Sequence, residues 1–235
     1  MDLLQQVSGI DIRRRGVPGT QADLYIRGGG FDQTLLLIDG MKMDDIQTGH
    51  HTLNLLLPIQ LIERIEIIKG PASRIFGQNA FNGAINIVTK SLPKFDKKQF
   101  EMLVSNPTFG SFKQFGFLIN SRLSLKEKFN SQLTFSRSKS DGYRYNTDYI
   151  NDFFFFKSEI KTQKNPIIIT SGFTEKKFGA NGFYASPSAT DQYEETQASF
   201  AGISTLLGSE KFLVRPKLYW RRGQDEYIYI RNNPS

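Results

Sequence analysis

The chain has 235 residues, no cysteine and a formal net charge of +7. It holds no run of the roughly 18 apolar residues that a membrane helix needs, since its best runs are Leu35–Ile38 and Leu53–Ile59. The first residues lack the basic and then apolar pattern of a secretory signal. The lack of cysteine excludes disulfides and thiolate metal sites. A transmembrane barrel of alternating strands would not be detected by the searches for a long apolar run or for a secretory signal, because its signal is weak in each segment.

Charge and aromatic residues divide the chain near residue 90. Residues 1–90 carry nine basic and nine acidic side chains, and the remaining 21 basic and 14 acidic ones carry the whole net charge. Four aromatic residues lie in the first part and 26 in the rest. We therefore predict two different domains, residues 1–90 and residues 91–235.

Residues 1–90 have the pattern of a small mixed α/β domain. Turn signals are the glycines 28–30, which favour positive φ, and Asp39-Gly40. We predict helices at 2–7, 58–64 and 72–76, and strands at 10–13, 22–27, 34–38, 65–69 and 84–89. The predicted core is Leu24, Ile26, Leu36, Ile38, Ile65, Ile67, Ile85 and Ile87.

Two features of this first domain invite other functions. The glycines 28–30 do not have the spacing of a dinucleotide-binding or phosphate-binding loop, so they do not predict nucleotide binding. His50 and His51 are adjacent, and adjacent side chains on a strand point to opposite faces, which disfavours one shared metal ion. A histidine pair on a polar surface loop is the favoured interpretation.

Residues 91–235 alternate with period two. In 112–124, for example, Phe115, Phe117 and Ile119 share one face, while Asn120 and Arg122 share the other. Apolar residues outside and charged residues inside are typical of a water-lined barrel in lipid, although a soluble β-sandwich would also hide one apolar face. About seven strands are predicted, at 99–107, 112–124, 128–140, 149–163, 166–178, 193–208 and 211–224.

The first domain resembles the plug domain of TonB-dependent outer-membrane receptors. The similarity lies in LLQQVSGIDIRRRGVPGTQADLYIRGGGFDQTLLLIDGMKM, residues 3–43, followed by IERIEIIKGPASRIFGQNAFNGAINIVTK, residues 62–90. Several motifs occur in the family's order across this length. One departure is Phe76, where the family usually has tyrosine.

The resemblance implies a plug followed by antiparallel transmembrane strands. Family barrels close with about 22 strands, and seven strands cannot enclose a plug because barrel diameter grows with strand number. We therefore expect an incomplete barrel and a fragment of a longer protein, without the TonB-binding segment that would lie upstream of residue 1. The expected location is the outer membrane of a Gram-negative bacterium, with the strands facing outer-membrane lipid.

The resemblance also implies active import of a scarce ligand powered by the TonB protein. Neither an enzyme nor a nucleic-acid-binding protein is expected, since no nucleophile with its base is visible. An alternative of another class is a surface binding fragment that has lost transport. In the family, charges of these motifs lie at the boundary between plug and barrel, which assigns this plug charge set: Arg27, Glu63, Arg64, Glu66 and Arg74.

Two long connections are similar to those of the vitamin B12 transporter branch of the family. They are SDGYRYNTDYIND, from residue 140, and KFGANGFYASPSATDQYEETQ, from residue 177. This implies cobalamin as the ligand, with a ferric siderophore as the alternative ligand. The ligand-binding loop residues would be Tyr143, Arg144, Tyr145, Asn181, Phe183 and Tyr184.

In that branch, acidic residues of early loops bind calcium, and no covalent cofactor is expected. The matching carboxylates here are Asp141, Asp148, Asp152 and, as a weaker candidate, Asp191. Ca²⁺ takes six to eight oxygen ligands, so carboxylates of flexible loops would suit it. Their spacing alone does not predict a site, because it is not that of an EF-hand and loops are commonly rich in aspartate.

Overall fold

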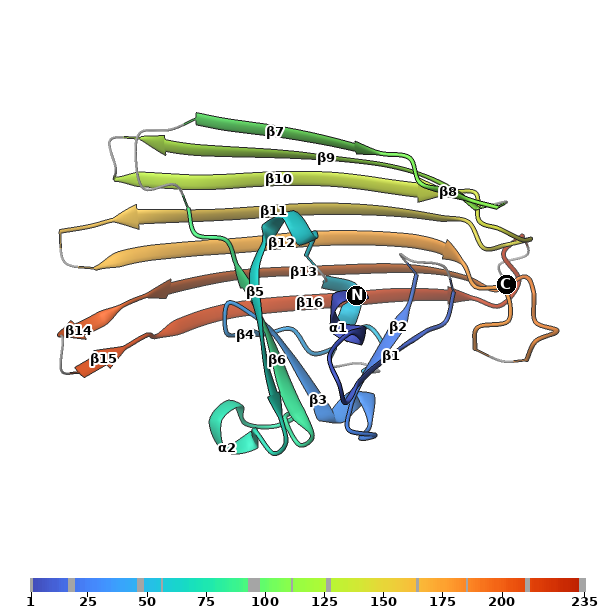
Figure 1. The fold of residues 1–235 in the computed structure, drawn as a ribbon, viewed down its shortest axis with the longest axis horizontal. Coiled ribbons are helices and arrows are strands. Elements are labelled where there is room, and N and C mark those ends of the chain that lie inside the picture. Colours follow the sequence, from blue (N-terminus) through green and yellow to red (C-terminus); the bar gives the residue numbers. More distant parts are fainter. Residues whose placement is uncertain are drawn as a thin grey trace. The chain divides into compact units, whose positions relative to one another are not determined.

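A computed structural model gives the structure of the chain (Figure 1). It describes residues 2–16, 20–45, 49–55, 57–92, 98–110, 112–125, 128–163, 165–184, 186–209 and 212–232. These form two compact units, Met1–Ser91 and Leu92–Ser235, each considered by itself below. The predicted division at residue 90 lies one residue before this boundary. No helix among the described residues is long and apolar enough to cross a membrane.

The first unit combines short strands with helices of about one turn. A hairpin of β1 and β2 is separate from a four-stranded sheet of order β4-β3-β6-β5, in which β3 and β6 are parallel and the other pairs antiparallel. The strands are β1 (Ile10–Arg14), β2 (Ala22–Ile26), β3 (Thr34–Ile38), β4 (Met41–Lys42), β5 (Ile62–Lys69) and β6 (Gly83–Thr89). The helices are α1 (Asp2–Gln5), α2 (Ser73–Phe76) and the 3-10 turns η1 (Phe31–Gln33), η2 (Thr52–Leu55) and η3 (Ile59–Leu61).

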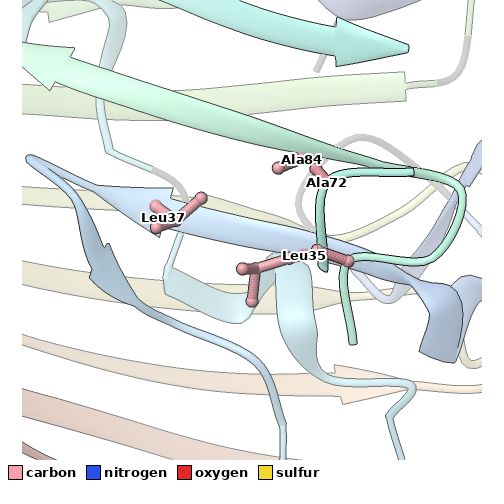
Figure 2. Close-up of a cluster of buried hydrophobic side chains, with 5 residues drawn as sticks. Leu35, Leu37, Ala72 and Ala84 are labelled. Carbon is pink, nitrogen blue, oxygen red and sulfur yellow. The ribbon is translucent and has the colours of Figure 1, made fainter. Parts of the chain in front are cut away.

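The central strand β3 organises the hydrophobic core of this unit. All five of its residues are buried, because other elements cover both faces of the strand. On one face, Leu35 and Leu37 pack with Ala84 of β6 and with Ala72, which directly precedes α2 (Figure 2). The small alanine side chains allow the helical turn to approach the sheet closely.

Most of the predicted core is confirmed. The buried residues are Leu24, Ile26, Leu36, Ile38, Ile85 and Ile87. Ile65 and Ile67 are only half-buried, because β5 is an edge strand of its sheet. The helix predicted at 58–64 is wrong beyond its first turn: η3 ends at Leu61, and the alternating sequence that follows forms β5.

The turn after β3 is held by contacts from β6. Asp39 and Gly40 have φ of 48° and 75°, the left-handed region that an Asp-Gly pair tolerates. The Asp39 carboxylate accepts hydrogen bonds from the Thr89 backbone N–H at 2.8 Å and from its hydroxyl at 2.6 Å. The Gly40 N–H donates to the Asn86 side-chain oxygen at 2.9 Å. Asn86 and Thr89, which are far from Asp39 and Gly40 in the sequence, thus stabilise their turn.

The second unit is an antiparallel sheet of long strands. The order is β16-β13-β12-β11-β10-β9-β7, so nearly all sequence neighbours pair, with the two-residue β8 also on β9 (Figure 1). The long strands are β7 (Lys98–Ser105), β9 (Phe112–Leu125), β10 (Phe129–Ser140), β11 (Tyr149–Lys161), β12 (Pro166–Gly179), β13 (Tyr193–Thr205) and β16 (Lys217–Ile228). The predicted seven strands and the fold class are confirmed.

The two faces of this sheet have the polarity expected of a strand array in lipid. Polar side chains on one face are buried and bonded to each other: Gln132 and Thr134 both donate to the Asn120 side-chain oxygen at 2.9 Å. On the other face, Leu133 and Phe135 are 47% and 39% exposed. A soluble protein would hide these apolar groups, so this face suits contact with lipid.

The polar face is less uniform than predicted. Phe153 and Phe155 of β11 lie on it, buried, with ring centroids 6.5 Å apart. Gly172 of β12 lies opposite both Phe155 and Phe200 of β13. A Cβ atom at Gly172 would lie 2.3 Å from the Phe200 ring, so any larger residue at this position would require the ring to move.

The last predicted hairpin, 193–208 and 211–224, is interrupted. β13 ends at Thr205 and β16 begins at Lys217; between them β14 (Leu207–Ser209) and β15 (Phe212–Val214) form a small hairpin of their own. Pro216 lacks the N–H that would continue the ladder, and its carbonyl accepts from the Thr205 N–H at 3.3 Å.

We predict that Asp39→Ala lowers the free energy of unfolding of the first unit by about 1–3 kcal/mol, because two hydrogen bonds and a residue suited to positive φ are lost. Urea unfolding of residues 1–91, whose core is internal, measures the change. Asp39→Asn retains one acceptor oxygen and the tolerance of positive φ, so it should lose less. An alanine variant as stable as the wild type would contradict the assigned role of this turn.

Candidate functional site

Three segments meet at one end of the long-stranded sheet. They are the connection after β10 (residues 141–148), the connection after β12 (residues 180–192) and the segment after β16 (residues 229–232). Because neighbouring strands are antiparallel, these segments gather at the same end, on the right in Figure 1. We call them the loop cluster. The turns after β9 and β11 lie at the opposite end.

Two asparagines connect the first two segments. Asn146, at φ 51°, donates from its side chain to the carbonyl oxygens of Thr190 at 2.8 Å and Gln192 at 2.6 Å. In return, Asn181 donates to the Tyr145 carbonyl oxygen at 2.7 Å. Side-chain amides thereby satisfy loop backbone groups that no strand pairs, which fixes the two loops against each other.

Arg231 joins the third segment to the other two. Its guanidinium donates to both carboxylate oxygens of Asp148, at 2.6 and 2.9 Å, and to the Asn146 side-chain oxygen at 3.1 Å. It also lies 4.3 Å from the centroid of the Tyr193 ring. The backbone N–H of Arg231 donates to the Asp191 carbonyl oxygen at 2.9 Å. Hydrogen bonding to Asp148 raises the pKa of Arg231, so the guanidinium stays charged.

Sequence reasoning missed Arg231, because it follows the last strand and belongs to no motif. The one available signal was strand pairing: β16 pairs with β13, and the register Tyr193↔Ile228 brings the residues after 228 to the loop end. A basic residue just beyond a strand end, near acidic loops, was therefore a candidate partner.

The predicted ligand-binding residues divide into an exposed and a buried group. Tyr143, Tyr145 and Tyr184 are 46%, 64% and 39% exposed, and Arg144 is also exposed. The remaining two are buried and support the loops: Asn181 and Phe183. Their placement leaves the exposed four as the residues available to a ligand, and a binding role for them stays a prediction.

Polar and aromatic contacts position these exposed side chains. The Arg144 guanidinium donates to the Asn181 carbonyl oxygen at 3.0 Å. The Tyr145 hydroxyl donates to Asp191 at 2.7 Å, and this bond raises the pKa of Tyr145. Tyr184 packs edge-on against Tyr227 of β16, with centroids 5.7 Å apart. The loop cluster therefore presents ordered tyrosine rings beside an arginine.

The four predicted calcium ligands do not converge on one point. Asp148 is bound by Arg231, Asp191 by Tyr145, and Asp152 receives two bonds of 2.6 Å from Arg137. Asp141 is exposed at the loop start. Within the described ranges, no group of three or more His, Cys, Asp or Glu is placed to hold a metal ion. As placed, this donor set does not fit Ca²⁺, and the calcium site stays a prediction.

The plug charge set is only partly assembled. Arg64 contacts Glu66 at 2.7 Å and Glu63 at 3.4 Å along the edge strand β5. The Asn86 side chain, and then Arg64, donate to Glu66 and lower the pKa of its carboxyl. Arg27, at φ 50° after β2, and Arg74 on α2 are exposed, and within the described part of the chain neither forms an ion pair with that cluster.

The histidine pair is not a shared site. His50 lies with Nδ1 3.0 Å from the carboxylate of Asp23, whose side chain is fully buried, and its ring stacks on Phe31 at 4.1 Å. The Gln21 side chain also donates to Asp23, at 2.7 Å. Sequence reasoning missed this buried carboxylate, because Asp23 occupies a polar position of an alternating strand.

Comparison with known proteins gives a consistent result for both units. The family model described as TonB-dependent Receptor Plug Domain matches residues 1–84. A protein of Vibrio vulnificus (strain YJ016) named Vitamin B12 transporter BtuB is 30% identical over 146 residues, which cover 62% of this chain and 23% of that protein. The Vibrio cholerae (strain O395) protein of that name is 28% identical over 142 residues, covering 60% of this chain and 22% of its own length.

Solved structures of more distant proteins share the fold. The ferric citrate transporter FecA matches with a TM-score of 0.78 at 13% identity, over 96% of this chain and 37% of that chain. The siderophore receptor PirA from Pseudomonas aeruginosa matches with a TM-score of 0.69 at 18% identity, over 94% of this chain and 42% of that chain. The chain thus spans less than a quarter of the Vibrio relatives. Residues 1–84 therefore match the plug-domain family of TonB-dependent receptors, and the chain, with its plug domain and antiparallel barrel-type sheet, shares the fold of these solved structures.

Proposed function

We propose that this chain is part of an active importer in the outer membrane of a Gram-negative bacterium, and that its ligand is cobalamin. The observation that carries the proposal is the loop cluster, where ordered aromatic side chains stand exposed on a rigid hydrogen-bonded scaffold. Support for the ligand comes from the relatives named as vitamin B12 transporters, which align over about three fifths of the chain.

The chemistry of the loop cluster suits a bulky ligand fringed with amides. Tyrosine rings provide broad apolar contact together with a hydroxyl group, and Tyr143 and Tyr184 are both available for such contact. Loop carbonyl and amide groups would provide hydrogen bonds at the rim. Arg144, placed over the Tyr143 ring at 5.4 Å, adds a cation.

A ferric siderophore is the second candidate ligand, and Arg144 is the observation that favours it. A charged guanidinium beside tyrosines would attract an anionic iron chelate. The siderophore and citrate receptors that share the fold are 13–18% identical to this chain, which shows the fold and does not favour their ligands.

Transport would begin in the plug. We propose that the TonB protein pulls a segment upstream of residue 1, and that the hairpin of β1 and β2 opens first. Of the described strands, β1 pairs with β2 alone, over five residue pairs. A strand held on one side is peeled away one hydrogen bond after another, which needs less force than shearing a whole sheet.

The plug charge set is proposed to hold the plug in the barrel until this force arrives. Charged groups that become enclosed need partners, because an unpaired buried charge is costly. Arg27 is exposed within this segment and has no ion-pair partner among the described residues, so it is available to a barrel partner. The local pairs of Arg64 with glutamates would contribute less, as exposed pairs do.

Crosslinking β1 to β2 tests the proposed transport step. In a full-length receptor carrying this segment, Asp11→Cys with Tyr25→Cys places thiols at directly opposed positions, in a segment that has no native cysteine. We expect the oxidised variant to bind ligand normally and to lose uptake into cells, with recovery on reduction; single-cysteine variants are the controls. Ligand uptake at the wild-type rate by the crosslinked protein would exclude the opening of this hairpin as a transport step. A wild-type receptor that binds ligand but never imports it would favour the alternative of a binding protein without transport.

Removing the charge of Arg27 tests the plug charge set. We expect Arg27→Ala to reduce ligand uptake several-fold while leaving the equilibrium affinity for ligand near its wild-type value. Arg13→Ala is the matched control, because Arg13 is also exposed and already pairs locally with Asp11 at 2.9 Å. Equal uptake by both variants and the wild type would count against the charge set.

Ligand identity is tested by direct binding to the same full-length receptor. We expect cyanocobalamin to bind and a ferric siderophore to bind weakly or not at all, with Tyr184→Ala weakening cobalamin binding by about tenfold through loss of one aromatic contact. Tyr219→Ala, on β16 outside the loop cluster, is the control. Tight binding of the siderophore without binding of cobalamin would show that the ligand is a ferric siderophore and not cobalamin.

A further inference from the structure

We propose that arginine side chains, and not a bound metal ion, hold the loop cluster together, with Arg231 as the positioning residue. The inference concerns how the loops are ordered, so it does not depend on which ligand they bind. Its basis is the way in which the acidic residues of these loops are already paired.

The Arg231–Asp148 pair has the geometry of a strong, directional contact. Two parallel N–H···O bonds of 2.6 and 2.9 Å join the planar guanidinium to the carboxylate, an arrangement that lysine cannot reproduce. The same guanidinium bonds Asn146 and covers the Tyr193 ring. One side chain thereby contacts the first loop, the strand that follows the second loop, and its own segment.

The contacts of Arg231 extend to the residues that carry both loops. Asn146, which Arg231 bonds, is the residue that donates to the second loop at Thr190 and Gln192. Asp191, whose carbonyl oxygen accepts from the Arg231 backbone, binds the Tyr145 hydroxyl. Loss of the guanidinium would therefore loosen both loops together, because each bond in this network positions the next.

Asp152 is also paired with an arginine, but its side chain lies on a face of the sheet that does not lead to Asp148. It lies directly across from Arg137 in the β10–β11 ladder and receives two bonds from it. Alternation along β11 places Asp152 on the face of Phe154, the exposed apolar face, and away from the buried Tyr149. It therefore does not join Asp148 in a common site.

A calcium ion at these carboxylates would have to displace arginines. Ca²⁺ needs six to eight oxygen ligands, yet the oxygens of Asp148 and Asp152 already accept short bonds from cations. A divalent ion beside a guanidinium is repelled by it. Arg231 supplies the positive charge and the crosslinks that a metal would otherwise bring to the loops, so the loops stay ordered when calcium is removed.

Hydrogen exchange of the loop amides tests this inference in the purified full-length receptor. Wild type, Arg231→Gln, Arg231→Lys and, as matched control, Arg215→Gln would each be measured with calcium and with a chelator. Arg215 lies next to β15, at the other end of the sheet. We expect wild type and the control to protect residues 141–148 and 180–192 equally in both conditions. Arg231→Gln should exchange about tenfold faster in both loops, as for loss of a charged hydrogen bond, and Arg231→Lys should not restore protection.

Two outcomes would overturn the inference. One is wild-type protection of these loops that falls when calcium is chelated, which would assign the ordering to the metal. The other is an Arg231→Gln receptor whose loops exchange as slowly as the wild type. Exchange in the middle of β12 serves as the internal check that the variant is folded; the comparison of wild type with and without chelator is decisive even if the variant is not.

Discussion

Unbroken backbone pairing along the long strands is the constraint on which the second unit depends. Hydrocarbon offers no water to a free N–H or carbonyl group, so each strand must satisfy its backbone through its neighbours. The ladder from β7 to β16 does this with antiparallel pairs over twelve or thirteen residues in its central strands. The side chains of the outward face are apolar and exposed, which suits contact with lipid.

The same constraint determines where specificity can lie. Antiparallel strands return the chain to the same end of the sheet at every second connection. The residues of those connections do not take part in strand pairing, so their sequence is free to vary. Here they form a polar network of their own, in which asparagines and arginine replace strand partners. The plug follows a different principle, because its strands are short and its stability comes from a buried centre around β3 and the turn that Asp39 holds.

Sequence reasoning recovered what is local and periodic. The order of the plug motifs identified the first unit, and period-two alternation located the long strands, most of them within two residues at each end. It failed where distant residues decide the outcome. Alternation assigned a polar inner face, yet Phe155 and Phe200 lie there because Gly172 leaves room for a ring. Arg231 lies beyond the predicted end of the last strand and in no motif, and the pairing of β16 with β13 brings it to the loops.

The same distinction explains the candidate site. Resemblance to the vitamin B12 branch drew attention to aspartates as metal ligands and to Asn181 and Phe183 as ligand contacts. In the structure Asp148 accepts from Arg231, Asn181 donates to the Tyr145 carbonyl oxygen, and Phe183 is buried. A carboxylate is equally suited to a cation of either kind, metal or guanidinium, and only the position of a neighbouring strand decides between them.

The missing side chain at Gly172 has a consequence for how this sheet changes over evolution. The Phe200 ring occupies the space that any larger residue at 172 would need. A lineage that gains a methyl group at 172 must therefore reduce or move the ring at 200, and a lineage that loses the ring leaves a hollow that a side chain at 172 would fill. The two positions are free to drift only as a pair, so substitutions at one are expected to follow substitutions at the other across related receptors.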